Sequence, residues 1–211
     1  MKKVIIFGGG NISGLNIIND ITEYDIICVD RGVDFARKHD IEIDIAIGDF
    51  DSASSDSIRF IKDKNIEVLT FNRDKDYTDL ELSFIYAKEN LYDEIYVFGA
   101  IGTRMDHTLS NINLLKNYTS VDRKIVLIDD HNYIYYLDRD EKIVNNGIYN
   151  NVSILPTNDD TIINLLGVKW ELHNHYLKFG DSLTISNEFV SDKTAKIEIL
   201  EGNVFVILSK D

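Results

Sequence analysis

The feature that most constrains the fold is a regular alternation of short apolar runs and amphipathic segments through residues 1–128. Apolar runs rich in β-branched residues predict strands. Segments with apolar residues at helical spacing, such as Leu82, Ile85 and Tyr86, predict helices. Strict alternation favours right-handed crossovers and a parallel sheet covered on both faces. We therefore predict a Rossmann-like α/β domain, with strands at 4–7, 25–30, 43–47, 67–71, 94–98 and 124–128 and helices at 33–39, 55–64, 78–90 and 107–118.

The pattern changes from residue 133 onward, where the sequence shows no convincing helical period. Short β-type runs separated by turn residues occur at 133–137, 152–155, 183–185, 195–200 and 203–208. We therefore expect two domains, an α/β domain at 1–138 and a small, sandwich-like all-β domain at 139–211.

Composition argues against several classes of protein. The chain carries 36 acidic and 22 basic residues, a net charge of −14, and its Lys and Arg form no cluster, so we expect no nucleic-acid partner. No apolar run approaches the ~18 residues that a membrane span needs. The N-terminal apolar run meets Gly8 too soon for a signal peptide, and the single cysteine, Cys28, cannot form an intrachain disulfide. We expect a cytoplasmic protein with no membrane partner.

Two carboxylates follow the predicted third strand, which Gly48 ends. Asp49 and Asp51 come directly after it. At a separation of about 4 Å and an effective dielectric of about 20, two such charges repel by about 4 kcal/mol, unless they share a cation. Oxygen ligands suit Mg²⁺, which usually binds together with substrate phosphates. The alternative is that these residues cap the helix that begins near Ser54.

Loops after the other predicted strands carry further charged residues. Because parallel strands end at the same edge of a sheet, these loops should gather there. Carboxylates would hold a metal ion while cations neutralise phosphate oxygens. Capping explains some of the acids, but not why several acidic loops share one edge. The cations concerned are Arg31, Arg73, Lys75 and Arg104, and the acids at helix starts, where backbone N–H groups favour anions, are Asp79 and Asp106.

A glycine-rich segment supports a rival interpretation. Residues 8–13 nearly match the dinucleotide fingerprint, with Ser13 in place of the last glycine. Asp30 ends the second strand about 20 residues later, where an acidic residue would bind a ribose. This reading predicts an NAD(P)-dependent oxidoreductase, and a non-catalytic nucleotide-binding protein stays open as well. An ordinary phosphate-binding loop, G-x-x-x-x-G-K-[ST], does not occur.

Three motifs, in order along the chain, resemble those of the thiamine pyrophosphokinase family. They are Gly48-Asp49-Phe50-Asp51-Ser52, Asp74-Lys75-Asp76-Tyr77-Thr78-Asp79 and Gly102-Thr103-Arg104-Met105-Asp106-His107. In the C-terminal part, Gly167-Val168-Lys169-Trp170-Glu171-Leu172 and the segment 179–188 resemble the thiamine-binding β-domain of that family. The resemblance covers nearly the whole chain.

The resemblance implies the reaction ATP + thiamine → AMP + thiamine diphosphate with Mg²⁺. It also implies a homodimer whose sites lie between subunits, with catalysis assigned to 1–138 and thiamine binding to 139–211. Asp49, Asp51 and Asp79 would hold the metal and the pyrophosphate end. The candidates around the nucleotide and the transferred group are Asp30, Lys75, Asp76, Thr78, Arg104 and Asp106. The candidate catalytic residues are Asp49, Asp51, Asp79, Arg104 and Asp106.

For thiamine, the resemblance implies that Trp170 faces the rings, with hydroxyls from Thr184 and Ser186 nearby. Thiamine is cationic with two aromatic-like rings, so an aromatic wall suits it. From the residues alone, Trp170 is equally a candidate for the core of the β-domain. Some family members have glutamine at the position of Lys75 and serine at that of Thr184.

Overall fold

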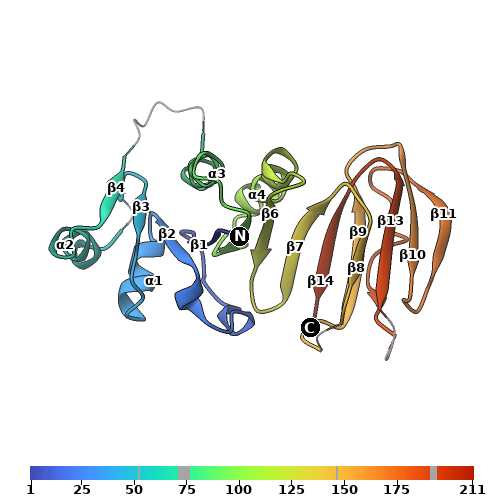
Figure 1. The fold of residues 1–211 in the computed structure, drawn as a ribbon, viewed down its shortest axis with the longest axis horizontal. Helices are drawn as coiled ribbons and strands as arrows, with labels where there is room; N and C mark the ends of the chain where they lie inside the picture. The colour runs from blue at the N-terminus through green and yellow to red at the C-terminus, as the bar shows by residue number, and fades with distance from the viewer. Residues whose placement is uncertain (52, 71–76, 146, 191–193) are drawn as a thin grey trace. The chain divides into compact units, whose positions relative to one another are not determined.

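The computed structural model describes residues 1–51, 53–70, 77–145, 147–190 and 194–211. The chain forms two compact units, Met1–Asp130 and His131–Asp211 (Figure 1). We had expected the boundary between residues 138 and 139. In the structure the strand Asn132–Leu137 (β7) belongs to the second unit, because it pairs antiparallel with the C-terminal strand of that unit.

The strands of the first unit all pair in parallel, as the alternating pattern predicts. Along the sheet they follow the order β6-β5-β1-β2-β3-β4. The side chains of the strands at the centre are buried, because helices cover both faces. The strands are Lys3–Phe7 (β1), Asp25–Val29 (β2), Ile45–Ile47 (β3), Glu67–Leu69 (β4), Glu94–Phe98 (β5) and Lys124–Ile128 (β6).

Two pairs of helices flank this sheet. α1 packs against α2, and α3 packs against α4 (Figure 1). The chain adds strands outward from β1 to β4 and then returns to add β5 and β6 on the other side. Right-handed crossovers therefore put the two helix pairs on opposite faces. The helices are Gly32–Lys38 (α1), Ser55–Asp63 (α2), Asp79–Glu89 (α3) and Met105–Tyr118 (α4). A doubly covered parallel sheet is thus confirmed, while the narrower label Rossmann-like stays a prediction.

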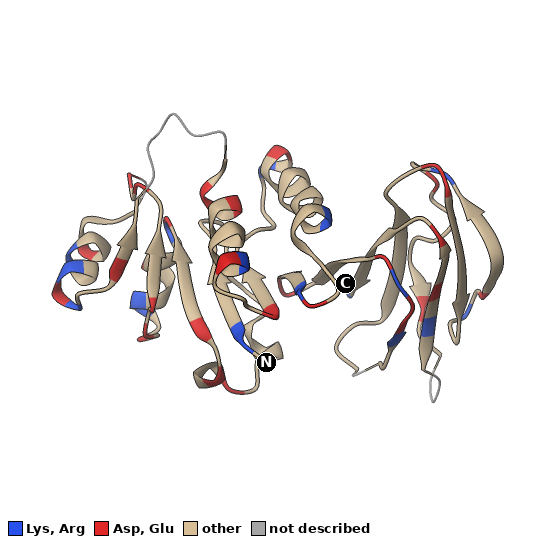
Figure 2. Cartoon of the chain, turned by 45° about the horizontal axis from the view of Figure 1, so that its top comes forward, with Lys and Arg blue, Asp and Glu red and all other residues tan. Residues whose placement is uncertain are grey.

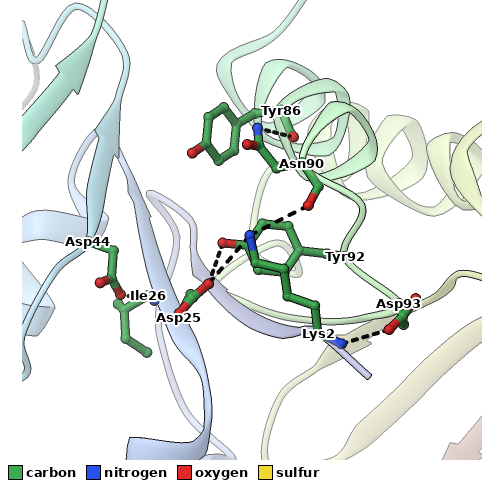
Figure 3. Close-up of polar contacts among 8 residues, drawn as sticks. All are labelled: Lys2, Asp25, Ile26, Asp44, Tyr86, Asn90, Tyr92 and Asp93. Atoms are coloured by element: carbon green, nitrogen blue, oxygen red, sulfur yellow. Dashed lines mark hydrogen bonds and ion pairs between the residues drawn. The ribbon is translucent and has the colours of Figure 1, made fainter.

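Polar side chains tie together the edge of the sheet at which the parallel strands begin (Figure 3). Lys2 precedes β1, and its Nζ lies 3.8 Å from Oδ2 of Asp25 and 3.9 Å from the ring centroid of Tyr92. The Tyr92 hydroxyl donates to the same Asp25 oxygen at 2.6 Å, and the Lys2 backbone N–H donates to Asp93 at 2.6 Å. These contacts join the starts of β1, β2 and β5, so the functional loops belong to the opposite edge.

The second unit consists of two antiparallel sheets, and its described residues contain no helix, which confirms the all-β prediction. The sheet orders are β12-β9-β14-β7 and β11-β10-β13-β8. Burial alternates along β10 and β14, as expected when one face of each sheet covers a core. The strands besides β7 are Glu141–Ile143 (β8), Asn151–Pro156 (β9), Thr161–Leu166 (β10), Leu172–Leu177 (β11), Asn187–Glu188 (β12), Ala195–Glu201 (β13) and Val204–Ser209 (β14).

One predicted strand is wrong. Residues 183–185 form a turn, in which the backbone N–H of Ile185 donates to the carbonyl of Ser182 at 3.2 Å. Ser186 then takes a φ of 56°, which ends any extended run and leads into the short β12. Leu183 and Ile185 are both exposed, so the apolar residues of this segment do not form the buried face of a strand.

Within the described part of the chain, no helix is long and apolar enough to cross a membrane. Figure 2 shows Lys and Arg positions scattered singly among Asp and Glu positions rather than gathered into a stripe.

Candidate active site

The acidic residues predicted at the carboxyl ends of the strands lie on consecutive connections of the first unit. Asp30 follows β2, Asp49 and Asp51 follow β3, and Asp79 is the first residue of α3, which comes after β4. Because β2, β3 and β4 are neighbours in the sheet, these connections leave it side by side at one edge.

Asp30 lies at the centre of this group. Its Oδ1 atom is buried and has no hydrogen-bond partner among the described residues. Burial and the charge of Asp79 raise the pKa of the Asp30 carboxyl to about 7, helped by the charge of Asp49, a hydrogen bond with Asp79 and the charge of Asp51. The four carboxylates are therefore close enough for their charges to interact. We call them the acidic cluster.

The turn that carries Asp49 and Asp51 has a strained backbone. Gly48 has a φ of 134° and its N–H donates to the carbonyl of Leu69 at 3.2 Å. Phe50 has a φ of 56°, a costly conformation for a bulky residue, and is only 8% exposed. The N–H of Asp51 donates to Oδ1 of Asp49 at 3.1 Å. The buried Phe50 ring thus anchors a tight turn that presents the two carboxylates.

The donor chemistry of the acidic cluster suits a hard divalent cation. Across the described residues, no three His, Cys, Asp or Glu side chains are placed to hold a metal ion by themselves. Mg²⁺ in nucleotide sites does not need such a set, because one or two carboxylates bind it together with phosphates and water. The buried, unsatisfied Oδ1 of Asp30 and the mutual repulsion that raises its pKa are the features that a cation would relieve.

Arg104 and Asp106 form a separate pair at the start of α4. The guanidinium donates to the carboxylate through Nη2 at 2.6 Å and through Nε at 3.3 Å. Hydrogen bonding to Arg104 lowers the pKa of Asp106. Both side chains are well exposed, at 70% and 65%, so the pair is accessible to a ligand but contributes little to stability.

Thr78 acts as the N-cap of α3. Its hydroxyl oxygen accepts a hydrogen bond from the N–H of Glu81 at 3.2 Å. Because the cap fixes the first turn of α3, it also fixes the backbone from which Asp79 projects. The candidates Lys75 and Asp76, like Arg73, fall outside the described residues.

The glycine-rich segment after β1 packs against the loop after β5. The N–H of Gly8 donates to the carbonyl of Phe98 at 2.7 Å, and that of Gly10 to the carbonyl of Gly99 at 3.0 Å. A Cβ atom on Gly10 would lie 2.5 Å from the Gly99 oxygen. The segment leads into a three-residue 3₁₀ helix, Leu15–Ile17, rather than the α-helix that binds a dinucleotide phosphate. The glycines thus have a packing role, and the oxidoreductase interpretation is not favoured.

In the second unit, Trp170 is 53% exposed and is therefore not a core residue of that unit. The backbone N–H of Trp170 donates to Oδ1 of Asn187 at 3.1 Å, and Nδ2 of Asn187 donates back to the Trp170 backbone carbonyl at 2.7 Å. Lys169 Nζ lies 4.5 Å from the centroid of the indole and 2.8 Å from Oε1 of Glu188. The backbone of Trp170 is thus held by a buried amide, and a cation that is paired with Glu188 lies near one face of the indole.

Thr184 and Ser186 differ in what they offer a ligand. Thr184 is 1% exposed and its hydroxyl donates to the carbonyl of Ile154, so it anchors the turn to β9. Ser186 is exposed, and its backbone N–H donates to the hydroxyl of Ser153 at 2.8 Å. Of these two residues, only Ser186 is exposed.

Two family profiles match this chain. The catalytic domain of thiamin pyrophosphokinase matches residues 22–127, and the vitamin B1 binding domain of thiamin pyrophosphokinase matches residues 136–204. The thiamine pyrophosphokinase of Bacillus subtilis is 33% identical, with both chains covered completely. The chain belongs to the thiamine pyrophosphokinase family.

Solved structures of thiamine pyrophosphokinases share the fold. The structure from Bacillus subtilis has a TM-score of 0.91 at 30% identity, with 100% of each chain covered. The structure from Geobacillus thermodenitrificans has a TM-score of 0.88 at 28% identity, covering 99% of this chain and 97% of the other. The boundary between the two family profiles lies between residues 127 and 136, near the division that the structure makes after Asp130.

Two supporting residues of this thiamine pyrophosphokinase family member were missed by sequence reasoning. Asn187 holds both backbone groups of Trp170 from 17 positions away. Asp34 on α1 accepts hydrogen bonds from Ser54 at the start of α2. No local pattern signals either contact, because each joins separate elements. The capping alternative considered from the sequence assigned Asp49 and Asp51 to α2, whereas the residue that caps this helix in the structure is Ser54.

Proposed function

We propose that this chain transfers the pyrophosphoryl group of ATP to the hydroxyl of thiamine in a Mg²⁺-dependent reaction, giving thiamine diphosphate and AMP. Membership of the thiamine pyrophosphokinase family supports the reaction. The observation that carries the assignment of the site is the convergence of Asp79, Asp49 and Asp51 on Asp30, which is half-buried and has a buried Oδ1 atom.

In this proposal the acidic cluster holds the metal and the pyrophosphate end of ATP, with Asp49, Asp51 and Asp79 as ligands. When bound, Mg²⁺ would neutralise phosphate oxygens as negative charge shifts during transfer. The protein supplies position: the strained turn fixes Asp49 and Asp51, and the Thr78 cap fixes Asp79. Direct transfer requires the thiamine hydroxyl in line with the β-phosphorus and needs no covalent nucleophile.

The remaining nucleotide contacts fall to Arg104, Asp106, Lys75 and Asp76. Arg104 directly precedes α4, and its planar guanidinium is suited to bidentate binding of phosphate. In the free chain the guanidinium of Arg104 is held by two hydrogen bonds to the carboxylate of Asp106. When ATP binds, phosphate oxygens would replace this carboxylate as the partner of Arg104. Helix starts at Asp79 and Asp106 add backbone dipoles that favour an anion.

The second unit would bind thiamine through Trp170 and Ser186. Lys169 lies near one face of the indole, so we assign the cationic thiamine to the other face. The hydroxyl of Thr184 stays with the backbone in this assignment and supports the turn that carries Ser186. We further propose a homodimer with each site shared between subunits, on the basis of the family resemblance.

A single assay tests the reaction. Purified protein is incubated with ATP and thiamine, with and without Mg²⁺, and AMP, ADP and thiamine diphosphate are measured. We expect AMP and thiamine diphosphate in equal amounts, and only with the metal. Formation of ADP would indicate simple phosphoryl transfer instead. Nucleotide binding without any product would favour the non-catalytic alternative, and reduction of a nicotinamide cofactor would favour an oxidoreductase.

A further inference from the structure

Asp34 on α1 forms a hydrogen-bonded junction with the start of α2. Its Oδ1 accepts from the hydroxyl of Ser54 at 2.6 Å, from the N–H of Ser54 at 3.3 Å and from the hydroxyl of Ser57. Ser57 is fully buried, and Nε of Arg37, one turn along α1, donates to its hydroxyl at 3.3 Å. One carboxylate oxygen therefore gathers three donors from the first turn of α2.

The junction stands at one end of the turn that carries two acidic-cluster residues. At the other end, the N–H of Gly48 is bonded to Leu69 on β4. Between the two ends, the N–H of Ala53 donates to the carbonyl of Phe50 at 3.1 Å and leads directly into Ser54. The turn is thus fixed to the sheet before Asp49 and to α1 after Asp51.

Capping alone does not require this junction. Ser54 already caps α2, because its hydroxyl oxygen accepts from the N–H of Ser57 at 3.2 Å. Asp34 belongs to a different helix, and what it adds is a connection between α1 and the capping residue. A connection of this kind restricts where the preceding turn can place its carboxylates.

We infer that Asp34 is a positioning residue, which fixes Asp49 and Asp51 for binding of the metal–nucleotide complex through Ser54. The inference rests on the proposed function, since it assigns the acidic cluster to Mg-ATP. Asp34 need not touch the ligand. Its negative charge is dispensable in this role, because the hydrogen bonds from Ser54 and Ser57 use Oδ1 as an acceptor, and an amide oxygen at the same place accepts them too, although more weakly than a carboxylate.

The experiment measures binding rather than turnover. The full chain is titrated calorimetrically with the Mg²⁺ complex of α,β-methylene-ATP, in which carbon replaces the bridging oxygen whose bond to phosphorus breaks in pyrophosphoryl transfer. The variants are Asp34→Ala, Asp34→Asn and Ser54→Ala. Asp56→Ala is the matched control, because it removes an exposed carboxylate from the first turn of the same helix.

We expect Asp34→Ala and Ser54→Ala each to raise the Kd by about 10- to 100-fold, the effect typical of partners that orient metal ligands. Asp34→Asn should stay within about threefold of the unaltered chain, and Asp56→Ala within about twofold. The Kd of the double variant Asp34→Ala/Ser54→Ala should not exceed the higher Kd of the two single variants, because both substitutions remove the same contact. A variant that only folds less completely would reduce the number of binding sites at unchanged Kd.

Unchanged Kd in Asp34→Ala, or a loss in Asp34→Asn as large as in Asp34→Ala, would overturn the inference. Ser54→Ala carries the same test if Asp34→Ala does not fold, because it leaves Asp34 in place. Failure of the proposed function is recognised separately. It would show as an unaltered chain that binds the nucleotide analogue but makes no thiamine diphosphate, while the comparison of Kd values still decides the role of Asp34.

Discussion

The Oδ1 atom of Asp30 lies 2.2 Å from the point that a Cβ atom on Gly48 would occupy. A glycine at this position therefore lets the carboxylate lie against the backbone directly before Asp49. The same glycine has a φ of 134°, which other residues rarely adopt. Two requirements thus meet at Gly48: the space for Asp30, and the turn that presents Asp49 and Asp51.

The first prediction follows from this contact. Gly48→Ala must displace the Asp30 carboxyl or the turn, so we expect a loss of about 1–3 kcal/mol in the free energy of unfolding. Activity should fall at least about tenfold beyond what partial unfolding explains, because the acidic cluster is rearranged. Denaturant melts and the AMP-release assay measure the two effects. Gly9→Ala is the stability control, since its Cβ would meet nothing closer than 4.0 Å. A Gly48→Ala protein as stable and active as the control would contradict the assignment.

The second prediction concerns the charges of the acidic cluster. Asp49→Asn and Asp51→Asn should each abolish turnover, because an uncharged amide binds Mg²⁺ much more weakly than a carboxylate does. Neither change should lower the thermal midpoint of the free chain, because each removes a charge that repels Asp30. Melts with and without Mg-ATP provide the check: the unaltered chain should be stabilised by the complex and the variants should not. Near-normal turnover in either variant would remove that residue from the site.

Much of the fold could be predicted because the same sequence pattern, a short apolar run between polar residues, marks strand after strand. The strands Glu94–Phe98 and Lys124–Ile128 were predicted at their observed bounds, since polar residues frame short apolar runs. The strand Leu172–Leu177 was not predicted, because only its two end residues are apolar and it lies at the edge of its sheet. Of this strand only Leu177 is buried, so the sequence lacks the alternation of apolar and polar residues that marks a half-buried strand.

The candidate site divides in the same way. Parallel strands dictate that Asp30, Asp49 and Asp79 meet at one edge, so topology sufficed to group them. The contact between Asp34 and Ser54 depends on how α1 and α2 pack, which no local spacing encodes. Likewise, the exposure of Trp170 could not be predicted from its residue type alone. The sequence left it open whether Trp170 belongs to the core or to a ligand wall, and its exposure in the structure places it outside the core of the second unit.

The third prediction tests whether a site is shared between subunits. The assay uses a thiamine concentration far below the Kd of Trp170→Ala, so that this variant is nearly inactive. An inactive Asp51→Asn protein mixed with Trp170→Ala protein should then regain part of the activity, because hybrid dimers contain one site with both residues intact. Subunit exchange is verified first with differently tagged chains. Recovery of about a quarter of the normal rate is the upper bound for random exchange if sites act independently. Exchange without recovery would indicate that each site is built within one chain.

The fourth prediction concerns pH. Burial alone would raise the pKa of Asp34, but hydrogen bonds from Ser54 and Ser57 outweigh it and lower the pKa. A carboxyl with a lowered pKa in the folded state stabilises the fold above its unfolded value, which is about 3.9, and this contribution is lost as the pH falls through the folded pKa. The thermal midpoint of the unaltered chain should therefore exceed that of Asp34→Asn at pH 6, and the difference should shrink toward pH 3. A difference that grows on acidification would contradict the sign.

The last prediction concerns Trp170, the single tryptophan of the chain. Because its side chain is half exposed, Trp170→Ala should change the free energy of unfolding by less than about 1 kcal/mol. If the indole stacks on thiamine, the same change should weaken thiamine binding by about 1–2 kcal/mol, or roughly 5- to 30-fold in Kd. Binding of Mg-ATP should stay the same, and Trp170→Phe should recover much of the loss since it keeps a ring face.

The fluorescence of Trp170 reports on the same contact directly, because no other indole contributes. Thiamine should change the emission in a saturable way, whereas Mg-ATP alone should change it little. Asn187→Ala is an informative companion, because it removes the amide that holds both backbone groups of Trp170 while leaving the ring itself. It should weaken thiamine binding without abolishing the fluorescence response. An emission indifferent to saturating thiamine, in protein shown to convert it, would exclude Trp170 from the thiamine site and leave the ring as an exposed part of the second unit.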